Sequence, residues 1–96
     1  MIAYILYSES LDRFYVGHTS LRVEERLAQH NNRQHLRAMT GRGIPWVEFY
    51  HFPCEDRLQA RRIERHIKAM KSRKYYESLK KYPELLERLR NRYKTG

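Results

Sequence analysis

The chain has 96 residues, 41% of them hydrophobic, which suits one small domain with its own core and excludes wholesale disorder. Its 20 Lys and Arg residues outnumber 11 Asp and Glu residues, and the net charge of +9 favours a polyanionic partner. The single cysteine, Cys54, excludes an internal disulfide and a cysteine zinc cluster and fits a reducing cytoplasm.

The first two apolar runs predict a β-hairpin. Residues 2–7 are almost continuously apolar and rich in Ile, Leu and Tyr, which is typical of a buried strand. This run is far too short for a signal peptide or a membrane span, so we expect no membrane partner. Residues 8–13 indicate a turn and residues 14–17 a second strand, and the short connection favours antiparallel pairing.

A helix, a loop and a third strand are expected next. Thr19 and Ser20 offer hydroxyls that can cap a helix running from about residue 21 to residue 32. Glycines and a proline among basic residues predict a loop over residues 33–45. The aromatic and β-branched run over residues 46–52 predicts the third strand.

The C-terminal half predicts three helices. Asp56 can cap the first, roughly residues 57–71, with an apolar stripe made of Ala60, Ile63, Ile67 and Met70. Ser72 can cap a short second helix, and Pro83 can begin a last one that carries Leu85, Leu86 and Leu89. We therefore expect one α+β domain over residues 1–96, a small three-stranded antiparallel sheet flanked by helices, with residues 76–96 as a helical extension.

Two polar residues of the first helix fall beside its apolar face. At 100° per residue, Arg26 and His30 share an arc of about 100° with Val23 and Leu27, so they lie along the edge of the buried stripe. Such an arginine can simply lay its stem over apolar surface, next to a partly buried histidine. It is also well suited to hold a phosphate through two parallel hydrogen bonds.

Glu64 has a similar position on the later helix, beside Ile63. It can form an ordinary exposed pair with Lys68 one turn on. Alternatively, it can bind Mg²⁺, which often takes only one or two protein carboxylates and fills its octahedron with water and substrate oxygens.

Tyr4 and Tyr15 are ordinary core residues by type, although their hydroxyls need partners if buried. Paired strands could bring both hydroxyls to one surface, and Gly17 could mark a bulge or a close approach of another backbone. The remaining histidines show no convincing metal-ligand spacing, so we expect surface or loop positions for His18, His35, His51 and His66.

Basic residues cluster in the C-terminal half and could neutralise several phosphates, although many are expected to be solvated helix faces. The clusters are Arg61-Arg62, Arg65, Lys68, Lys71, Arg73-Lys74 and Lys80-Lys81. Trp46, Tyr75 and Tyr76 could stack on bases, with packing as the more ordinary use.

Taken together, these positions resemble the GIY-YIG endonuclease superfamily, specifically its small stand-alone bacterial members related to the nuclease domain of the excinuclease UvrC. The resemblance covers residues 2 to about 75 and lies in four segments, residues 4–7, 15–19, 26–31 and 60–68. The first motif reads Ile2-Ala3-Tyr4, so only its tyrosine matches.

The resemblance implies hydrolysis of DNA phosphodiester bonds with one Mg²⁺ or Mn²⁺ and no small-molecule cofactor. It implies that Glu64 binds the metal, that Arg26 offsets charge on the phosphoryl group and that His30 hydrogen-bonds a tyrosine or the phosphate. Tyr4 or Tyr15 would take the proton of the attacking water, which requires a lowered phenol pKa. We expect DNA contacts from Gly17, Thr19, Asn31, Lys68, Lys71, Arg73 and Lys74.

Other functions fit the composition as well. A non-catalytic nucleic-acid-binding module on the same fold needs only the basic surface, and a structural protein of a ribonucleoprotein is a third possibility. Branched or flapped DNA is a candidate substrate, and the sequence leaves DNA repair, recombination and mobile-element roles open.

Overall fold

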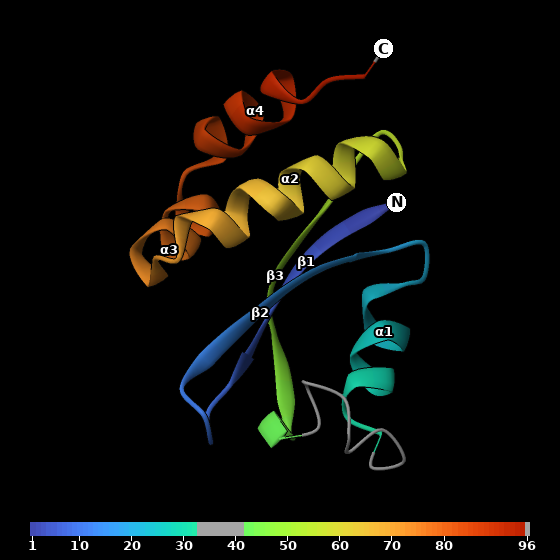
Figure 1. The fold of residues 1–96 in the computed structure, drawn as a ribbon, viewed down its shortest axis with the longest axis vertical. Coiled ribbons are helices and arrows are strands. Elements are labelled where there is room, and N and C mark those ends of the chain that lie inside the picture. The colour runs from blue at the N-terminus through green and yellow to red at the C-terminus, as the bar shows by residue number, and fades with distance from the viewer. Residues whose placement is uncertain (33–41, 96) are drawn as a thin grey trace.

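The computed structural model describes residues 1–32 and 42–95, which form a three-stranded antiparallel sheet with helices on both faces (Figure 1). The chain order is β1 (Ile2–Ser8), β2 (Arg13–Thr19), α1 (Val23–His30), β3 (Trp46–Pro53), α2 (Arg57–Met70), α3 (Arg73–Lys81) and α4 (Pro83–Arg92). The expected α+β architecture is confirmed. Most of the loop expected over residues 33–45 and His35 lie outside the described residues.

Strand β1 lies between β2 and β3, and helices cover both of its faces. Ala3 and Ile5 belong to the core shared with α2, α3 and α4, whereas Tyr4 and Leu6 pack with Val23 of α1 on the opposite face. A strand covered on both sides has no solvent-facing positions, which explains why residues 2–7 are apolar without alternation. The two outer strands, β2 and β3, are the edges of the sheet.

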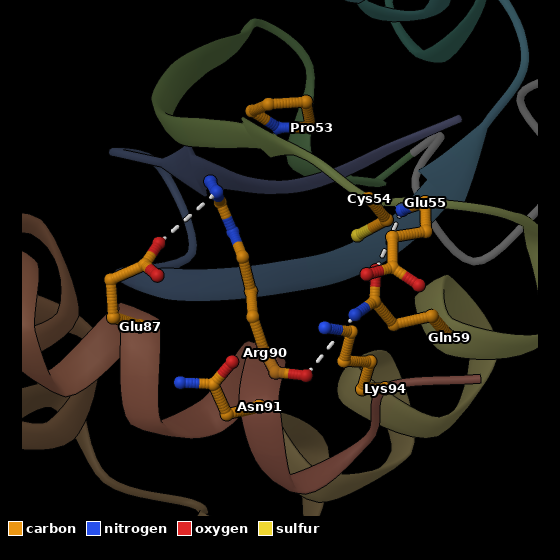
Figure 2. Close-up of a pocket in the computed structure, with 8 residues that line it drawn as sticks. All are labelled: Pro53, Cys54, Glu55, Gln59, Glu87, Arg90, Asn91 and Lys94. Atoms are coloured by element: carbon orange, nitrogen blue, oxygen red, sulfur yellow. Dashed lines mark hydrogen bonds and ion pairs between the residues drawn. The ribbon is translucent and has the colours of Figure 1, made fainter. Parts of the chain in front are cut away.

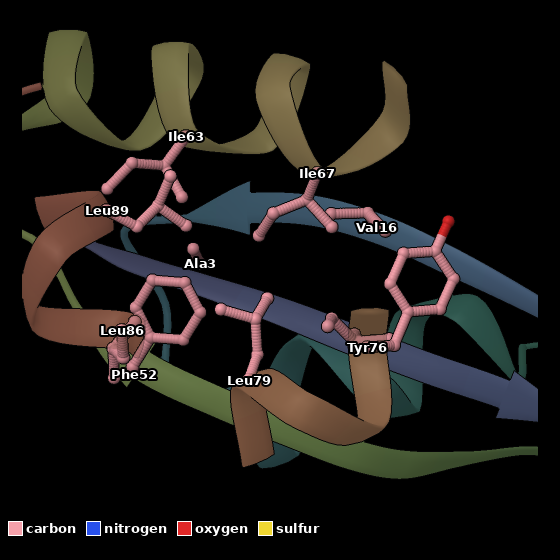
Figure 3. Packing of buried hydrophobic residues seen from close by; sticks show 10 residues of the cluster. Ala3, Val16, Phe52, Ile63, Ile67, Tyr76, Leu79, Leu86 and Leu89 are labelled. Atoms are coloured by element: carbon pink, nitrogen blue, oxygen red, sulfur yellow. The ribbon is translucent and has the colours of Figure 1, made fainter. Parts of the chain in front are cut away.

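The larger core cluster joins the sheet to all three C-terminal helices (Figure 3). Its labelled members are Ala3, Val16 and Phe52 from the sheet, Ile63 and Ile67 from α2, Tyr76 and Leu79 from α3, and Leu86 and Leu89 from α4. The packing fixes α2 across β2, and α2 is the helix that carries Glu64.

The predicted caps of α2 and α3 are confirmed: Asp56 accepts the backbone N–H of Gln59 at 2.8 Å, and Ser72 accepts that of Tyr75 at 3.1 Å. Helix α2 ends one residue early, because Lys71 adopts the left-handed conformation with φ of 47°. The expected place of Met70 in the buried stripe is wrong, since its side chain lies in the last turn and is 44% exposed.

The start of α1 differs from the expected one. Strand β2 continues to Thr19, which pairs with Ile2, and the Thr19 hydroxyl accepts the backbone N–H of Leu21 at 3.0 Å, ahead of the helix. Helix α1 is therefore shorter than predicted, with Arg22 at its N-cap and no side-chain cap bond. Across the described residues, every helix is too short or too polar to qualify as a membrane span.

Candidate functional site

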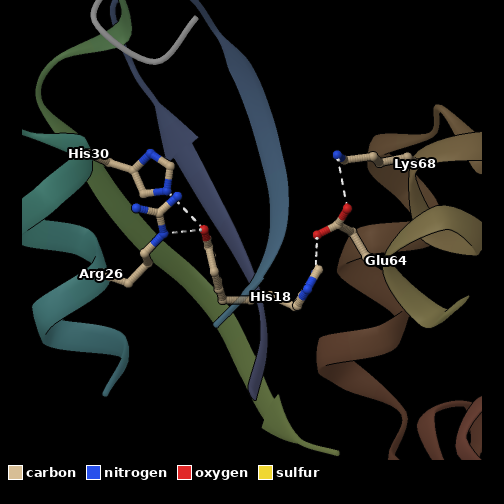
Figure 4. A network of polar contacts seen from close by, with 6 residues as sticks. His18, Arg26, His30, Glu64 and Lys68 are labelled. Atoms are coloured by element: carbon tan, nitrogen blue, oxygen red, sulfur yellow. Dashed lines mark hydrogen bonds and ion pairs between the residues drawn. The ribbon is translucent and has the colours of Figure 1, made fainter. Parts of the chain in front are cut away.

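The Tyr4 hydroxyl is the centre of a buried polar group on the α1 face of the sheet. Arg26 Nε donates a hydrogen bond to it at 3.1 Å, and His30 Nε2 lies 2.9 Å from it (Figure 4). Both partners come from adjacent turns of α1, since residues four apart lie on one helix face. The expected hydrogen bond between His30 and a tyrosine is therefore made to Tyr4.

Burial keeps this group neutral apart from its arginine. Desolvation raises the pKa of Tyr4 above its ordinary value of 10.0, against the lowering effect of the Arg26 hydrogen bond. Desolvation also lowers the pKa of His30 to about 4, with a smaller contribution from the Arg26 charge. At neutral pH, Tyr4 is thus a phenol next to an uncharged imidazole, and the charge of the group belongs to Arg26.

The guanidinium of Arg26 is held at a second point, because its Nη1 donates to Gln29 Oε1 at 2.7 Å. The side chain is partly exposed, so it joins the buried hydroxyl of Tyr4 to the solvent-facing surface. An arginine fixed in this way can present its remaining N–H groups to an anion with little loss of conformational entropy.

A second polar group is centred on Glu64 of α2. Its Oε1 lies 2.9 Å from His18 Nδ1, and its Oε2 accepts from Lys68 Nζ at 3.1 Å (Figure 4). The Glu64 side chain is 19% exposed, so solvent or a ligand can still reach the carboxylate. The predicted Glu64–Lys68 pair is confirmed, whereas metal binding by Glu64 stays a prediction.

Edge strand β2 passes between the two groups, with Arg26 and His30 on one side and Glu64 and Lys68 on the other (Figure 4). Tyr15 of β2 contacts both. Its ring centroid lies 4.8 Å from that of His30 and 5.7 Å from Lys68 Nζ. The five predicted catalytic residues therefore meet along one edge of the sheet, with Tyr15 where the two groups join.

Glycine at residue 17 is required by the Tyr4 ring. Gly17 pairs with Tyr4 across β1 and β2, and a Cβ there would stand 2.7 Å from Tyr4 Cζ. The two tyrosine rings lie on the same face of the sheet, with centroids 6.5 Å apart, as the hairpin pairing led us to expect. The bare backbone of Gly17 makes room for the hydroxyl at the centre of the α1 group.

The carboxylate of Glu64 could hold a divalent cation. Among the described residues, no group of three or more His, Cys, Asp or Glu side chains is placed to bind a metal. A single carboxylate that solvent can reach nevertheless fits Mg²⁺ or Mn²⁺, whose remaining positions are filled by water and phosphate oxygens. Glu64 is such a donor, so the residues present fit a one-metal site.

The other predicted DNA-contacting residues are not all gathered at this edge. Asn31 is engaged by the main chain of Trp46, accepting its N–H at 2.6 Å and donating to its C=O at 2.8 Å. Arg73 pairs with Asp12 and its guanidinium lies 5.3 Å from the Phe14 ring centre. Lys71 and Lys74 are exposed, and Thr19 is mostly buried at the end of β2.

His18 was missed by sequence reasoning, and its expected place on the surface or in a loop is wrong. It lies in β2 with its side chain 18% exposed and paired with Glu64. A signal was present, because Val16 and His18 are two apart and share one face of the strand. The helix that buries Val16 therefore also lies over His18. His66 likewise lies in α2, 2.9 Å from the Tyr93 hydroxyl, whereas His51 is an exposed residue of β3.

One pocket lies away from the predicted catalytic residues, on the α4 side of α2. This pocket of about 320 Å³ lies between the end of β3, α2 and α4, and the residues that line it include Cys54, Gln59 and Arg90 (Figure 2). None of the predicted catalytic residues lines it.

One of three comparisons with known proteins gave a match. No match was found among curated proteins, and none among solved structures. The family model described as the GIY-YIG catalytic domain matches residues 1–81 of the 96. This match spans every strand and the helices that carry Arg26, His30 and Glu64. The chain therefore belongs to the GIY-YIG family of nuclease domains.

Proposed function

We propose that this protein is a metal-dependent endonuclease that hydrolyses DNA phosphodiester bonds with one divalent cation, Mg²⁺ or Mn²⁺. The observation that carries the proposal is the place of Tyr15 between the two polar groups. Its ring lies beside His30, which shares the Tyr4 hydroxyl with Arg26, and beside Lys68, which pairs with Glu64. A cation, a metal-binding carboxylate and a hydroxyl are the groups that attack on a phosphodiester requires.

Glu64 would hold the metal, with His18 and Lys68 fixing the direction of its carboxylate. When bound there, the metal supplies positive charge to the oxygens of the scissile phosphate. Arg26 would bind a non-bridging phosphate oxygen and offset the charge that develops on it. Its contacts with Tyr4 and Gln29 keep the guanidinium in place before the substrate arrives.

Tyr15 is the better candidate for the group that takes a proton from the attacking water. Tyr4 is 1% exposed, and its hydroxyl is already bonded to Arg26 and His30, which leaves little room for water. Its raised pKa also makes it a poor proton acceptor. Tyr15 is half-buried and lies beside Lys68, next to the metal-binding carboxylate. We assign Tyr4 the role of positioning Arg26 and His30.

The experiment is a cleavage assay on linear, flapped and branched DNA with Mg²⁺ or with EDTA. Glu64→Gln should abolish metal-dependent cleavage, since an amide is a weak ligand for Mg²⁺, while leaving folding and DNA affinity intact. Cleavage by Glu64→Gln at the wild-type rate, with contaminating nuclease excluded, would show that the metal assignment is wrong. A preference for flapped or branched DNA would support a role in repair or recombination.

A non-catalytic nucleic-acid-binding module is the second candidate. One observation favours it: both Glu64 oxygens and two nitrogens of Arg26 already have protein partners. Such a network is stable by itself and does not require a metal or a phosphate. Binding of DNA by the wild type without any metal-dependent product would favour this module, and a strong preference for RNA would point to a ribonucleoprotein component.

A further inference from the structure

The positive charge of the chain is concentrated on α2 and the residues that follow it. Residues 57–74 contain eight Lys or Arg residues and a single acidic residue, Glu64. The net charge of the whole chain is +9, so this segment supplies most of it. Cations gathered on one exposed element create a local field that attracts a polyanion.

The two sides of α2 face different neighbours. On one side, Glu64 contacts His18 of β2; on the other, His66 contacts Tyr93, which follows α4. These contacts fix the orientation of the helix about its axis. They allow each exposed cation of α2 to be assigned to the β2 side, where the site lies, or to the α4 side.

Arg57 and Arg61 lie on the side of Glu64. At 100° per residue, they are about 20° and about 60° from Glu64 around the helix axis, whereas Arg62 is about 160° away. Both residues are exposed, and within the described part of the chain neither forms an ion pair. Lys68, by contrast, is paired with Glu64.

The spacing along the helix matches a nucleic-acid backbone. Arg57 precedes Glu64 by seven residues, or about 10 Å at 1.5 Å per residue. A duplex presents one phosphate per strand for every ~3.4 Å of its axis, so two long side chains over this length can reach about three phosphates. Lys68 and Lys71 lie on the other side of Glu64 along the chain, and both are exposed.

We propose that Arg57 and Arg61 bind backbone phosphates of DNA on the N-terminal side of Glu64. The DNA then runs along α2 and extends in both directions from the phosphate opposite Glu64. The identity of that phosphate as the one cleaved rests on the proposed function, whereas the contact of Arg57 and Arg61 with the backbone does not.

The test measures the affinity for a labelled DNA duplex by fluorescence anisotropy, in EDTA and over a series of KCl concentrations. Each phosphate contact contributes about 0.9 to the slope of log affinity against log salt. The double variant Arg57→Gln/Arg61→Gln should lower this slope by about 2 and weaken binding at low salt at least tenfold. Arg57→Lys/Arg61→Lys keeps the charges and should retain the wild-type slope.

The matched control is Arg62→Gln/Arg88→Gln, which removes two exposed arginines on the α4 side and on α4 itself. Its slope should stay within about 0.5 of the wild type, since these residues face away from the site. Equal losses in the two double variants would mean that only net charge matters and would overturn the inference. An unchanged slope in Arg57→Gln/Arg61→Gln, with its folding verified by circular dichroism, would overturn it too.

Failure of this inference and failure of the proposed function give different results. Because EDTA removes the metal, the binding assay does not depend on cleavage. A protein that never cleaves DNA but shows the expected slopes would keep the inference and lose the nuclease function. A protein that cleaves DNA through Glu64 but shows no effect of Arg57→Gln/Arg61→Gln would keep the function and lose the inference.

Discussion

The ring of Tyr4 lies directly over the backbone of Gly17 on the neighbouring strand. A Cβ at residue 17 would stand 2.5 Å from the Tyr4 hydroxyl oxygen, closer than non-bonded atoms approach. The glycine is not needed for its own backbone, because no glycine among the described residues has a positive φ. It is needed because any side chain at residue 17 would displace the Tyr4 hydroxyl, which holds Arg26 and His30 in place.

Gly17→Ala should therefore destabilise the protein and inactivate the site together. Overpacking of this kind typically costs about 1–3 kcal/mol, and the displaced hydroxyl would release Arg26. Urea unfolding and the cleavage rate measure the two effects. In a double-mutant cycle, Tyr4→Phe removes the closest contact, so its cost in the Gly17→Ala background should be smaller than in the wild type. If the costs of Gly17→Ala and Tyr4→Phe were strictly additive, the added methyl group would not meet the Tyr4 hydroxyl.

Tyr4→Phe and Tyr15→Phe should differ in their effects. Tyr15→Phe removes the proposed proton acceptor and should lower kcat by at least about 100-fold, the usual contribution of a general base. Its unfolding free energy should change little, because Tyr15 makes ring contacts that phenylalanine keeps. Tyr4→Phe leaves His30 without its partner, and so should also lower stability by about 1–3 kcal/mol. A larger kcat loss in Tyr4→Phe would reverse the two roles.

The stability of the protein should fall on mild acidification because of His30. Burial, and secondarily Arg26, lowers the pKa of His30 from 6.5 to about 4. In the unfolded chain His30 therefore binds a proton near pH 6.5, whereas in the folded protein it binds one only near pH 4. The contribution of His30 to the free energy of unfolding is therefore complete above about pH 6.5. It is lost as the pH falls from there to about 4, and the loss amounts to up to about 3 kcal/mol.

Urea unfolding of the wild type and of His30→Gln across this pH range measures the effect. Glutamine can hydrogen-bond Tyr4 but does not titrate, so its stability should depend less on pH than that of the wild type. Parallel curves would place the pH dependence elsewhere, for instance at His66, whose pKa burial also lowers.

His18→Ala should weaken metal binding without abolishing it. Loss of a side chain that orients a metal-binding carboxylate commonly costs about 10–100-fold in metal affinity. The concentration of Mn²⁺ that gives half-maximal cleavage should rise by that factor, and so should the dissociation constant in a titration without DNA. His51→Ala, on the exposed edge strand β3, is the matched control. An unchanged titration in His18→Ala would show that Glu64 needs no support from β2.

Asn31→Ala should affect stability more than DNA binding. The side chain of Asn31 makes two hydrogen bonds with the Trp46 main chain, which tie the end of α1 to β3. Their loss should lower the free energy of unfolding by about 2 kcal/mol. DNA affinity measured on the folded fraction should stay within about twofold, a difference of roughly 0.4 kcal/mol. A tenfold weaker affinity would restore Asn31 as a DNA contact.

The order of elements was readable from the sequence because each has a local signature. Asp56 and Ser72 cap helices by bonds within three residues, and both predictions are confirmed. The start of α1 was not readable, because the pairing of Thr19 with Ile2 across the hairpin extends β2 over the expected cap. A long-range pairing of this kind outweighs a local capping preference.

In the candidate site, too, local features could be predicted from the sequence and long-range contacts could not. Helical periodicity placed Arg26, His30 and Glu64 beside apolar stripes, which required only local geometry. Which residues contact each other depended on the register of β1 and β2 and on the packing of α2, so the role of His18 was missed. The local sequence around Asn31 and Arg73 likewise contains no sign of their partners, Trp46 and Asp12, which are distant in the chain.

The C-terminal helix has a consequence for any attempt to shorten the chain. The family match ends at Lys81, but Leu86 and Leu89 of α4 belong to the same core as Ile63, the neighbour of Glu64. A fragment that ends at Lys81 would lack Leu86 and Leu89, so the apolar face of α2 that contains Ile63 would be partly exposed to water. The helix that carries the Glu64 carboxylate would then be less firmly packed. Damage to such a fragment's activity would therefore measure lost packing, although every residue of the family match would still be present.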